Sequence, residues 1–477
     1  MNRNNFWNST IIFGFGFLLT RAVSFLLLPI HTNIINPNTM GYVFIFITFL
    51  AFMNAFYSFG MDSALLKYFH KNDKILFTSL ISTLIFSIPI SLLLLILSDY
   101  LQYILFKEPI SIESKILFNN HWIWLSVGIL TFDAISSRLM TLCRLLQLSW
   151  YYVFIAAINV IASIGLNIYF LYYKAVSIQF DSIVFSMIIV SFMQLIFLIP
   201  IFLYHTKNWQ FDLHALKKMF KFAWPFFPAT IFFIIIELVD RIMIENLLST
   251  QDVGLYGSGY KIGALMLMII RAFNINWQPY YLDIGAKSEN DLIKNFSHIG
   301  NIILIILIMI TGIISSIWPF LIQLKINSFS ILGPNFISGG VVIPYILIAY
   351  CFYGLFILQM PSIYLKNKQN WAPLIWGSGA VINIISNILL LPILGFVGAG
   401  VSTILAYFSM STLLIYKNCQ WMWIPYNYKR ILFVIVLSSL QYALIKVTNI
   451  HFSFIILIYL MIMGRILKNT YQAYKLI

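Results

Sequence analysis

Long apolar runs alternate with short polar turns along the whole chain. A helix needs about 20 apolar residues to cross the hydrocarbon core of a bilayer. Fourteen runs meet or approach this length, at roughly 9–31, 40–60, 75–98, 121–142, 151–173, 182–204, 222–246, 253–273, 299–321, 338–364, 371–391, 397–416, 431–448 and 452–467. Because the turns are short, we expect no soluble domain between two helices. The pattern predicts an all-α polytopic membrane protein with about 14 transmembrane helices.

The amino-acid composition supports this interpretation. Hydrophobic residues make up 61% of the 477 residues and charged residues 9%, with a mean hydropathy of +0.90. Soluble domains carry about 25% charged residues, so this chain has too few to cover its surface in water. The net charge of +14 does not indicate a nucleic-acid partner, because the basic residues are spread between the apolar runs. We expect membrane lipids around the protein and no nucleic acid.

The positions of the basic residues predict the orientation of the chain. If the N-terminus lies inside, 21 of the 29 Lys and Arg residues fall in or beside cytoplasmic segments, 5 outside and 3 within spans. Cytoplasmic loops of membrane proteins carry such an excess of positive charge. An even number of spans returns the C-terminus to the same side. We therefore predict that both termini are cytoplasmic.

A polar stretch after the sixth run divides the chain into two lobes. Its segment Asn208–Lys221 has apolar residues at helical spacing beneath a basic face, which predicts an amphipathic helix on the cytoplasmic surface. We expect an N-lobe of helices 1–6, a linker, a C-lobe of helices 7–12, and an appended pair of helices, at residues 1–204, 205–221, 222–416 and 417–477.

A weak internal repeat agrees with this division. The polar turn Asn36–Tyr42 joins the first two runs, and a similar turn, Ser249–Tyr256, joins the seventh and eighth. Since six is an even number of spans, both copies start on the same side of the membrane. The two lobes are therefore predicted to form a parallel repeat with its axis along the membrane normal.

The hairpin Trp224–Arg271 carries charge inside apolar runs, where each charge costs roughly 2.5 kcal/mol or more unless it is paired or faces water. Glu237 and Lys261 both lie about 12 Å below the predicted outer surface, so they could pair across the hairpin. In that interpretation both are structural. Asp240 and Arg241 lie nearer the interface, where they could line a cavity or extend toward water.

Arg21 is the charged residue placed most deeply in the first run, about 18 Å from its inner end and near the bilayer midplane. One interpretation is an anion clamp in a central cavity, because a guanidinium group binds phosphate in a bidentate way. The other is a structural pair with a carboxylate on a neighbouring helix, for which Asp133 is available. Both interpretations stay open at this point.

Motifs for catalysis and metal binding are missing from the sequence. There is no GxxxxGK[ST], HExxH or GxSxG motif, and no His or Cys cluster with metal-ligand spacing. Cys143, Cys351 and Cys419 lie within or beside apolar runs and are best explained as small core residues. We expect no enzyme activity, no catalytic residue, no metal site and no cofactor other than a coupling proton or sodium ion.

Several motifs together resemble a known family. They are GFLLTRAVSFLLLPI at Gly16–Ile30, FGMDSALLKYF at Phe59–Phe69, the Asp240–Arg241 pair, and VGLYGSGYKIG at Val253–Gly263 followed by Gln278-Pro279. In this order they resemble the polysaccharide flippases, of O-antigen, capsule or teichuronic type, in the multidrug/oligosaccharidyl-lipid/polysaccharide exporter superfamily. The resemblance extends over nearly the whole chain.

The resemblance implies two six-helix lobes around a cavity that opens alternately to each side of a bacterial cytoplasmic membrane. The implied substrate is an undecaprenyl-pyrophosphate-linked oligosaccharide, moved from the inner to the outer leaflet. A glycan polymerase and a chain-length regulator are the implied partners. On this view the buried cations that bind the pyrophosphate are Arg21, Arg241 and Lys261, and the candidates for a coupling proton or sodium ion are Glu237, Asp240 and Asp133.

Three alternatives to the flippase would each require other features of the sequence. A drug or cation antiporter of the same superfamily would need an acidic cavity, and Arg21 at the midplane argues against it. A membrane glycan polymerase would carry a large outer loop, whereas the longest expected outer loop, 99–120, has about twenty residues. A membrane scaffold without transport activity would not need a deeply placed arginine.

Overall fold

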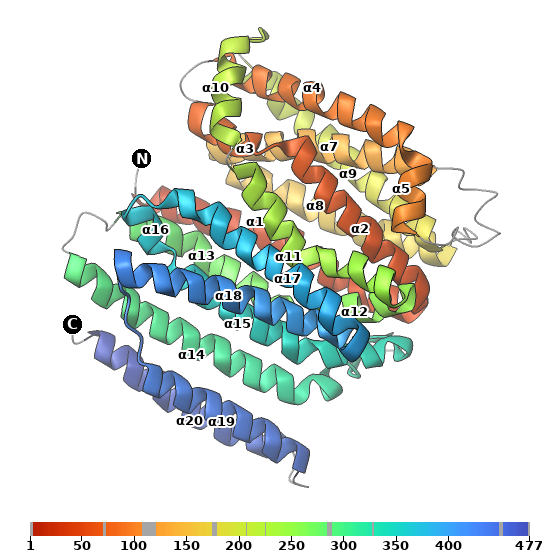
Figure 1. The fold of residues 1–477 in the computed structure, drawn as a ribbon. Helices are drawn as coiled ribbons and strands as arrows, with labels where there is room; N and C mark the ends of the chain where they lie inside the picture. Colours follow the sequence, from red (N-terminus) through yellow and green to blue (C-terminus); the bar gives the residue numbers. More distant parts are fainter. Residues whose placement is uncertain are drawn as a thin grey trace. The chain divides into compact units, whose positions relative to one another are not determined.

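The computed structural model describes residues 3–69, 73–106, 121–173, 179–206, 208–224, 226–283, 289–326, 329–447 and 452–475, which are helical along most of their length (Figure 1). A two-residue antiparallel pair joins β1 (Lys325–Ile326) to β2 (Phe329–Ser330). The chain divides into two compact units. Unit 1 comprises 1–234 and 249–254, and unit 2 comprises 235–248 and 255–477.

Unit 1 is a helical bundle in which α1 packs along α8, α7 packs against α9, and α4 packs against α7. Its described elements are α1 (Arg3–Ile34), α2 (Pro37–Ser58), α3 (Met61–Tyr68), α4 (Ile75–Ile96), α5 (Ser98–Leu105), α7 (His121–Leu145), α8 (Ser149–Ile168), the π-helix η2 (Tyr169–Tyr173), α9 (Gln179–His205), α10 (Leu213–Ala223) and the first part of α11 (Phe226–Leu247).

Unit 2 is built around α15, α17 and α18, which pack on one another, while α14 joins this group to the last two helices. Its described elements are the rest of α11, most of α12 (Thr250–Gly263), α13 (Leu265–Asp283), α14 (Glu289–Leu321), the 3-10 helix η4 (Pro334–Val342), α15 (Ile343–Gln359), α16 (Pro361–Leu365), the 3-10 helix η5 (Gln369–Trp371), α17 (Ala372–Leu394), α18 (Val397–Trp421), α19 (Tyr428–Val447) and α20 (Phe452–Lys475).

Each of the fourteen apolar runs lies on one helix or on consecutive helices. Among the described residues, 11 helices are long and apolar enough to cross a membrane, or up to 13 if each of two bent helix pairs counts as one span. These bent pairs are α10 with α11 and α12 with α13. The all-helical fold is therefore confirmed, while the count of fourteen spans and the cytoplasmic termini stay predictions.

The helix that begins the second run ends earlier than its hydropathy suggests. Phe59 and Gly60 separate α2 from α3 and both have positive φ, at 48° and 68°. A non-glycine residue in this left-handed region is uncommon and needs support from its surroundings. Phe59 has that support, because its ring stacks on Phe227 at 4.5 Å and on Phe220 at 5.3 Å between centroids.

The two repeated polar turns come together within unit 1. A Cβ atom at Gly41 of α2 would lie 2.1 Å from the Thr250 carbonyl oxygen, and one at Gly254 would lie 2.0 Å from the Pro37 carbonyl oxygen. Neither distance is possible for a real side chain, so glycine is required at both positions. The start of α2 and the start of α12 thus touch backbone to backbone through equivalent glycines.

The predicted amphipathic helix is present as α10, but its apolar face has a different partner. Asp212 caps the helix, since its Oδ1 accepts from the backbone N–H groups of His214 and Ala215 at 2.9 and 3.0 Å. The apolar face of α10 is buried on α3 and α4, through Ala215, Met219, Ala223, Met61, Ala64, Leu65 and Ile75. Neighbouring helices therefore cover the apolar face, and the position of this helix on the cytoplasmic surface stays a prediction.

Candidate functional site

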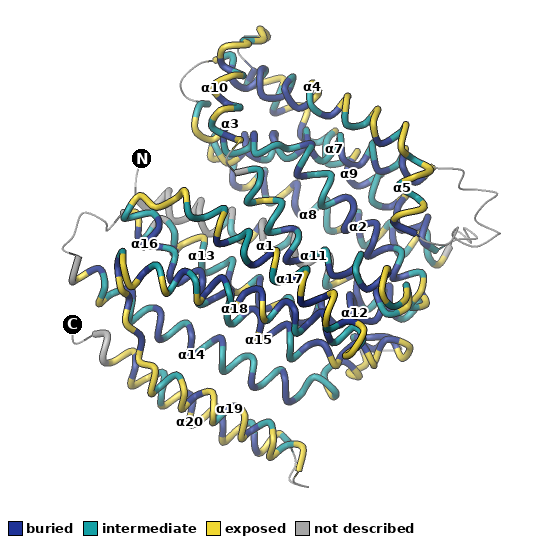
Figure 2. The backbone as a smooth tube through the Cα atoms, in the orientation of Figure 1, coloured by how far each residue is buried: buried dark blue, intermediate teal, exposed yellow. Residues whose placement is uncertain are grey.

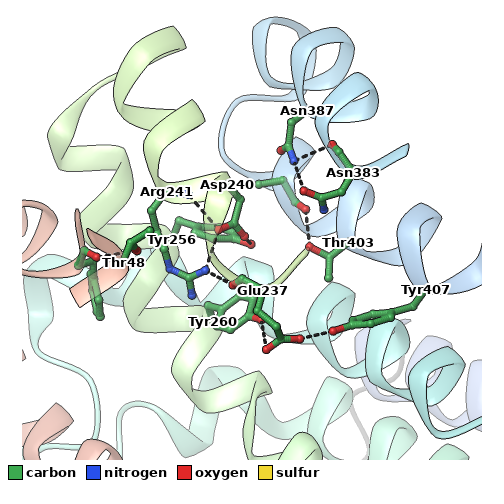
Figure 3. A network of polar contacts seen from close by, with 12 residues as sticks. Thr48, Glu237, Asp240, Arg241, Tyr256, Tyr260, Asn383, Asn387, Thr403 and Tyr407 are labelled. Atoms are coloured by element: carbon green, nitrogen blue, oxygen red, sulfur yellow. Dashed lines mark hydrogen bonds and ion pairs between the residues drawn. The ribbon is translucent and has the colours of Figure 1, made fainter. Parts of the chain in front are cut away.

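Helix α11 carries four charged residues into the interior of unit 2, of which Glu245 is 6% exposed and the other three lie together. Glu237, Asp240 and Arg241 are 7%, 0% and 4% exposed. Figure 3 shows their side chains among tyrosines that other helices supply. Buried charges are tolerated when they are paired and hydrogen-bonded, so the partners of these three residues decide what the cluster can do.

The Glu237 carboxylate is surrounded by tyrosine hydroxyls. Its Oε2 accepts from Tyr350 at 2.9 Å and from Tyr260 at 3.2 Å, and its Oε1 accepts from Tyr407. The hydroxyls of Tyr260 and Tyr350 also lie 2.7 Å apart. These tyrosines come from α12, α15 and α18, so three helices converge on one carboxylate of a fourth.

Asp240 and Arg241 form an ion pair beside this carboxylate. Arg241 Nη1 lies 2.7 Å from Asp240 Oδ1, and the Tyr256 hydroxyl donates to Oδ2. The guanidinium carbon of Arg241 also lies 4.2 Å from the centroid of the Tyr260 ring, a cation–π contact. Arg241 is therefore held inside unit 2 by Asp240 in this structure.

The predicted pair between Glu237 and Lys261 is corrected by these contacts. Both oxygens of Glu237 accept from tyrosine hydroxyls, and the carboxylate that pairs with a cation on α11 is that of Asp240. Lys261 lies on α12 directly after Tyr260 and is partly buried. Depths along the hairpin alone could not predict the partners of Glu237, because α15 and α18 bring hydroxyl donors to it.

Amide side chains that the sequence interpretation missed lie on α17. Asn387 Nδ2 donates to the backbone oxygen of Asn383 at 2.9 Å and to its Oδ1 at 3.2 Å. Asn383 Nδ2 and Asn387 Oδ1 are buried without a hydrogen-bond partner. Figure 3 draws them in one view with Thr403 of α18 and with the acids of α11. The sequence signal that could have identified them is their spacing of four residues within an apolar run, which puts both on one face of a helix.

The remaining site residues belong to unit 1. Asp133 on α7 forms a side-chain hydrogen bond with Ser191 on α9. Arg21 lies on α1, but its side chain is outside the part of the chain that the structure describes. Whether it pairs with Asp133 therefore stays a prediction.

Unit 1 also holds an ion pair that the sequence interpretation missed. Arg138 on α7 is fully buried and pairs with Asp62 on α3, and its Nη2 donates to the Ser58 carbonyl oxygen at 2.6 Å. The Ser137 hydroxyl donates to the other oxygen of Asp62 at 2.9 Å. Arg138 thus caps the end of α2 at the break before α3. The sequence alone places Arg138 with the cytoplasmic basic residues, because it lies near the end of its run.

Comparison with known proteins identifies the family of this chain. Residues 6–283 match the model of the family described as polysaccharide biosynthesis protein, which is more than half of the chain. The chain belongs to this family. The resemblance seen in the motifs is therefore confirmed, and the protein is a multi-pass membrane protein of polysaccharide biosynthesis. A comparison with curated protein sequences finds no match.

Solved structures resemble this family member along nearly their whole length. The lipid II flippase MurJ in an inward closed conformation is 14% identical with a TM-score of 0.71, covering 97% of this chain and 98% of its own. An inward-facing multidrug resistance MATE family transporter of the MOP superfamily is 11% identical with a TM-score of 0.63, covering 90% and 96%. An outward-facing one is 11% identical with a TM-score of 0.61, covering 92% and 97%. At these identities the likeness shows the fold.

Proposed function

We propose that this protein flips an undecaprenyl-pyrophosphate-linked oligosaccharide from the inner to the outer leaflet of a bacterial cytoplasmic membrane by alternating access. The observation that carries the proposal is the buried network formed by the acids and arginine of α11 with tyrosines of α12, α15 and α18, in a member of a polysaccharide biosynthesis family. Charged residues inside transmembrane segments are costly and mark substrate or ion pathways. The likeness to the lipid II flippase supports the same class of cargo.

The coupling ion is proposed to bind at the acids of α11. Two carboxylates, Glu237 and Asp240, share the buried cluster with one guanidinium, and the unpartnered amide atoms of Asn383 and Asn387 offer further polar contacts. A proton or sodium ion would balance the second negative charge. With no P-loop in the sequence, an ion gradient is the expected energy source.

The ion pair between Asp240 and Arg241 suggests how ion binding is linked to substrate binding. Asp240 holds Arg241 by an ion pair of 2.7 Å. A proton or sodium ion on Asp240 would weaken that pair and free the guanidinium for a pyrophosphate oxygen, which it binds well. Together with Arg21 and Lys261, Arg241 would then supply cationic contacts for the headgroup. In unit 1, Asp133 is the proposed candidate for the coupling ion.

The test is glycan display in cells in which this protein is the flippase under study. Arg21→Ala is expected to abolish surface glycan while the protein level stays normal, because the midplane guanidinium is lost. Lys368→Ala, which removes an exposed lysine, is the matched control and should display glycan normally. Normal glycan in the Arg21 variant would exclude the clamp.

A drug or cation antiporter is the second candidate, since two buried acids and the likeness to multidrug transporters favour it. It predicts that deletion raises sensitivity to cationic drugs and leaves surface glycan intact. The flippase predicts the reverse. A glycan polymerase and a chain-length regulator remain proposed partners, detectable by crosslinking from the membrane.

A further inference from the structure

The outward face of α10 is basic along its whole length. At 100° per residue, Leu213, Lys217, Lys221, His214 and Lys218 fall within a sector of about 140°, and all five are exposed. The opposite side, with Ala215 and Met219, is buried on α3 and α4. Figure 2 shows the exposed residues of α10 on the side away from its buried ones. The helix is thus held by one face and offers three lysines on the other.

Asp212, the acid that directly precedes α10, is already engaged. Asp212 accepts the backbone N–H groups of His214 and Ala215, and its own N–H donates to Thr78 Oγ1 of α4 at 3.1 Å. These bonds fix the first turn of α10 on unit 1. Asp212 therefore caps the helix and does not serve as a counter-ion for Lys217 or Lys221.

The flanking residues place this helix at the membrane boundary. The apolar helix α9 ends at His205, and the apolar helix α11 begins at Phe226. Just before α10, Trp209 is 52% exposed although its ring packs near Phe77 and Phe202, and Leu213 is 56% exposed. Exposed tryptophan beside lysine is typical of the headgroup region of a bilayer.

We propose that the lysine face of α10 binds anionic phospholipid headgroups of the membrane in which the protein resides. Charge complementarity supports lipid as the occupant, because anionic headgroups attract polybasic helices at a bilayer surface. Trp209 and Leu213 would insert at the level of the headgroups, while Lys217, Lys218 and Lys221 bind their phosphates. Since α10 is fixed to α3 and α4, the protein presents this surface without having to fold on the lipid.

The test measures lipid selectivity of the full chain directly. The protein is reconstituted in bilayers of equal phosphatidylcholine and phosphatidylglycerol, and the association of spin-labelled phosphatidylglycerol is compared with that of spin-labelled phosphatidylcholine. The triple variant Lys217→Gln, Lys218→Gln, Lys221→Gln should lose selectivity by about fivefold for each lysine in contact with a headgroup. High salt should reduce the selectivity of the native protein in the same direction.

The matched control removes the same charge elsewhere. Lys368, Lys429 and Lys468 are exposed lysines on other segments, and their triple Gln variant should keep most of the selectivity. Equal losses of lipid selectivity in both triple variants would show that selectivity depends on the net charge of the protein, and this would overturn the proposal. Unchanged lipid selectivity in the α10 variant would also overturn it, and if glycan display falls in that case, an acidic protein partner is the better occupant. Because the measurement needs no transport, its outcome is independent of the proposed flippase activity.

Discussion

The two units bury charge in different ways. Unit 1 holds a compact pair, in which Arg138 is fully buried, binds Asp62 and caps the Ser58 carbonyl at the end of α2. Unit 2 holds a branched cluster, in which Asp240 pairs with the one arginine, Glu237 lies beside them, and the two acids accept from four tyrosines. The first arrangement has one acid for one base and ties α3 to α7. The second has an additional acid and buried amide atoms without partners nearby on α17.

This difference separates a structural pair from a site suited to ion exchange. A buried pair loses much stability when one partner is removed, because the other charge stays behind uncompensated. A carboxylate held by neutral hydroxyls can take up a proton or a cation without leaving a buried cation unpaired. The Arg138–Asp62 pair should therefore affect stability first, and the charged cluster of α11 should affect transport first.

The largest effect is expected for Asp62→Ala, which leaves Arg138 buried without its partner. The free energy of unfolding should fall by about 3–5 kcal/mol, measured as a lower thermal midpoint and a smaller folded fraction in detergent. The double variant Asp62→Leu, Arg138→Met removes both charges and should recover most of that loss. A single variant as stable as the native protein would show that the pair does not tie α3 to α7.

A smaller effect of another kind is expected for Glu237→Gln. The amide keeps the shape of the side chain, but the charged acceptor for three hydroxyls is lost, and such bonds contribute about 1.5–3 kcal/mol. Flipping in proteoliposomes should therefore fall about 10- to 100-fold, while the thermal midpoint changes less than in Asp62→Ala. Asp291→Asn, at an exposed carboxylate, serves as the control and should transport normally. If Glu237→Gln instead unfolded the protein and left the transport rate per folded molecule unchanged, the α11 cluster would act on stability and the proposed contrast would be wrong.

Double-mutant cycles sharpen the assignment of partners within unit 2. Glu237→Gln combined with Tyr407→Phe should show a coupling energy of about 0.5–3 kcal/mol, because the two side chains are hydrogen-bonded. Glu237→Gln combined with Lys261→Met should be additive within about 0.5 kcal/mol. Strong coupling to Lys261 and none to Tyr407 would restore the hairpin pair that the sequence suggested.

The smallest effect concerns Asp212, a partly exposed carboxylate that contrasts with the buried acids. The backbone N–H of Ala215, followed by that of His214, and the charge of Lys74 hold the pKa of Asp212 below its ordinary value of 3.8. Its contribution to the stability of α10 is therefore present above pH 3.8 and is lost as the pH falls through the lowered pKa. Exchange of the Ala215 amide, corrected for the intrinsic rate, should accelerate in that range. Asp212→Asn should show no such pH dependence, and an equal acceleration in it would exclude the titration of this cap.

Hydropathy predicted the helices well but could not predict their breaks. Every expected run is helical, because a segment in a bilayer must satisfy its backbone groups internally. The run 40–60 ends at the break Phe59–Gly60, and the runs 253–273 and 338–364 are divided, the first at Ala264 and the second between Val342 and Ile343 and at Met360. Such breaks depend on neighbours, as the stacking of Phe59 on Phe227 shows, and a neighbour distant in sequence leaves no trace in hydropathy.

The sequence by itself determined that this is a helical membrane protein, because apolar runs of such length have no other stable environment. It also determined the family and the repeated turns around Gly41 and Gly254, although it could not show that each glycine contacts the backbone of the other turn. The tertiary structure alone decided the partners of the buried charges. Arg241 binds Asp240, Glu237 binds tyrosines of three other helices, and Arg138 binds Asp62. Sequence spacing along one hairpin cannot determine these choices, since a buried charge binds whichever donor or acceptor the packing of distant helices brings within hydrogen-bond distance.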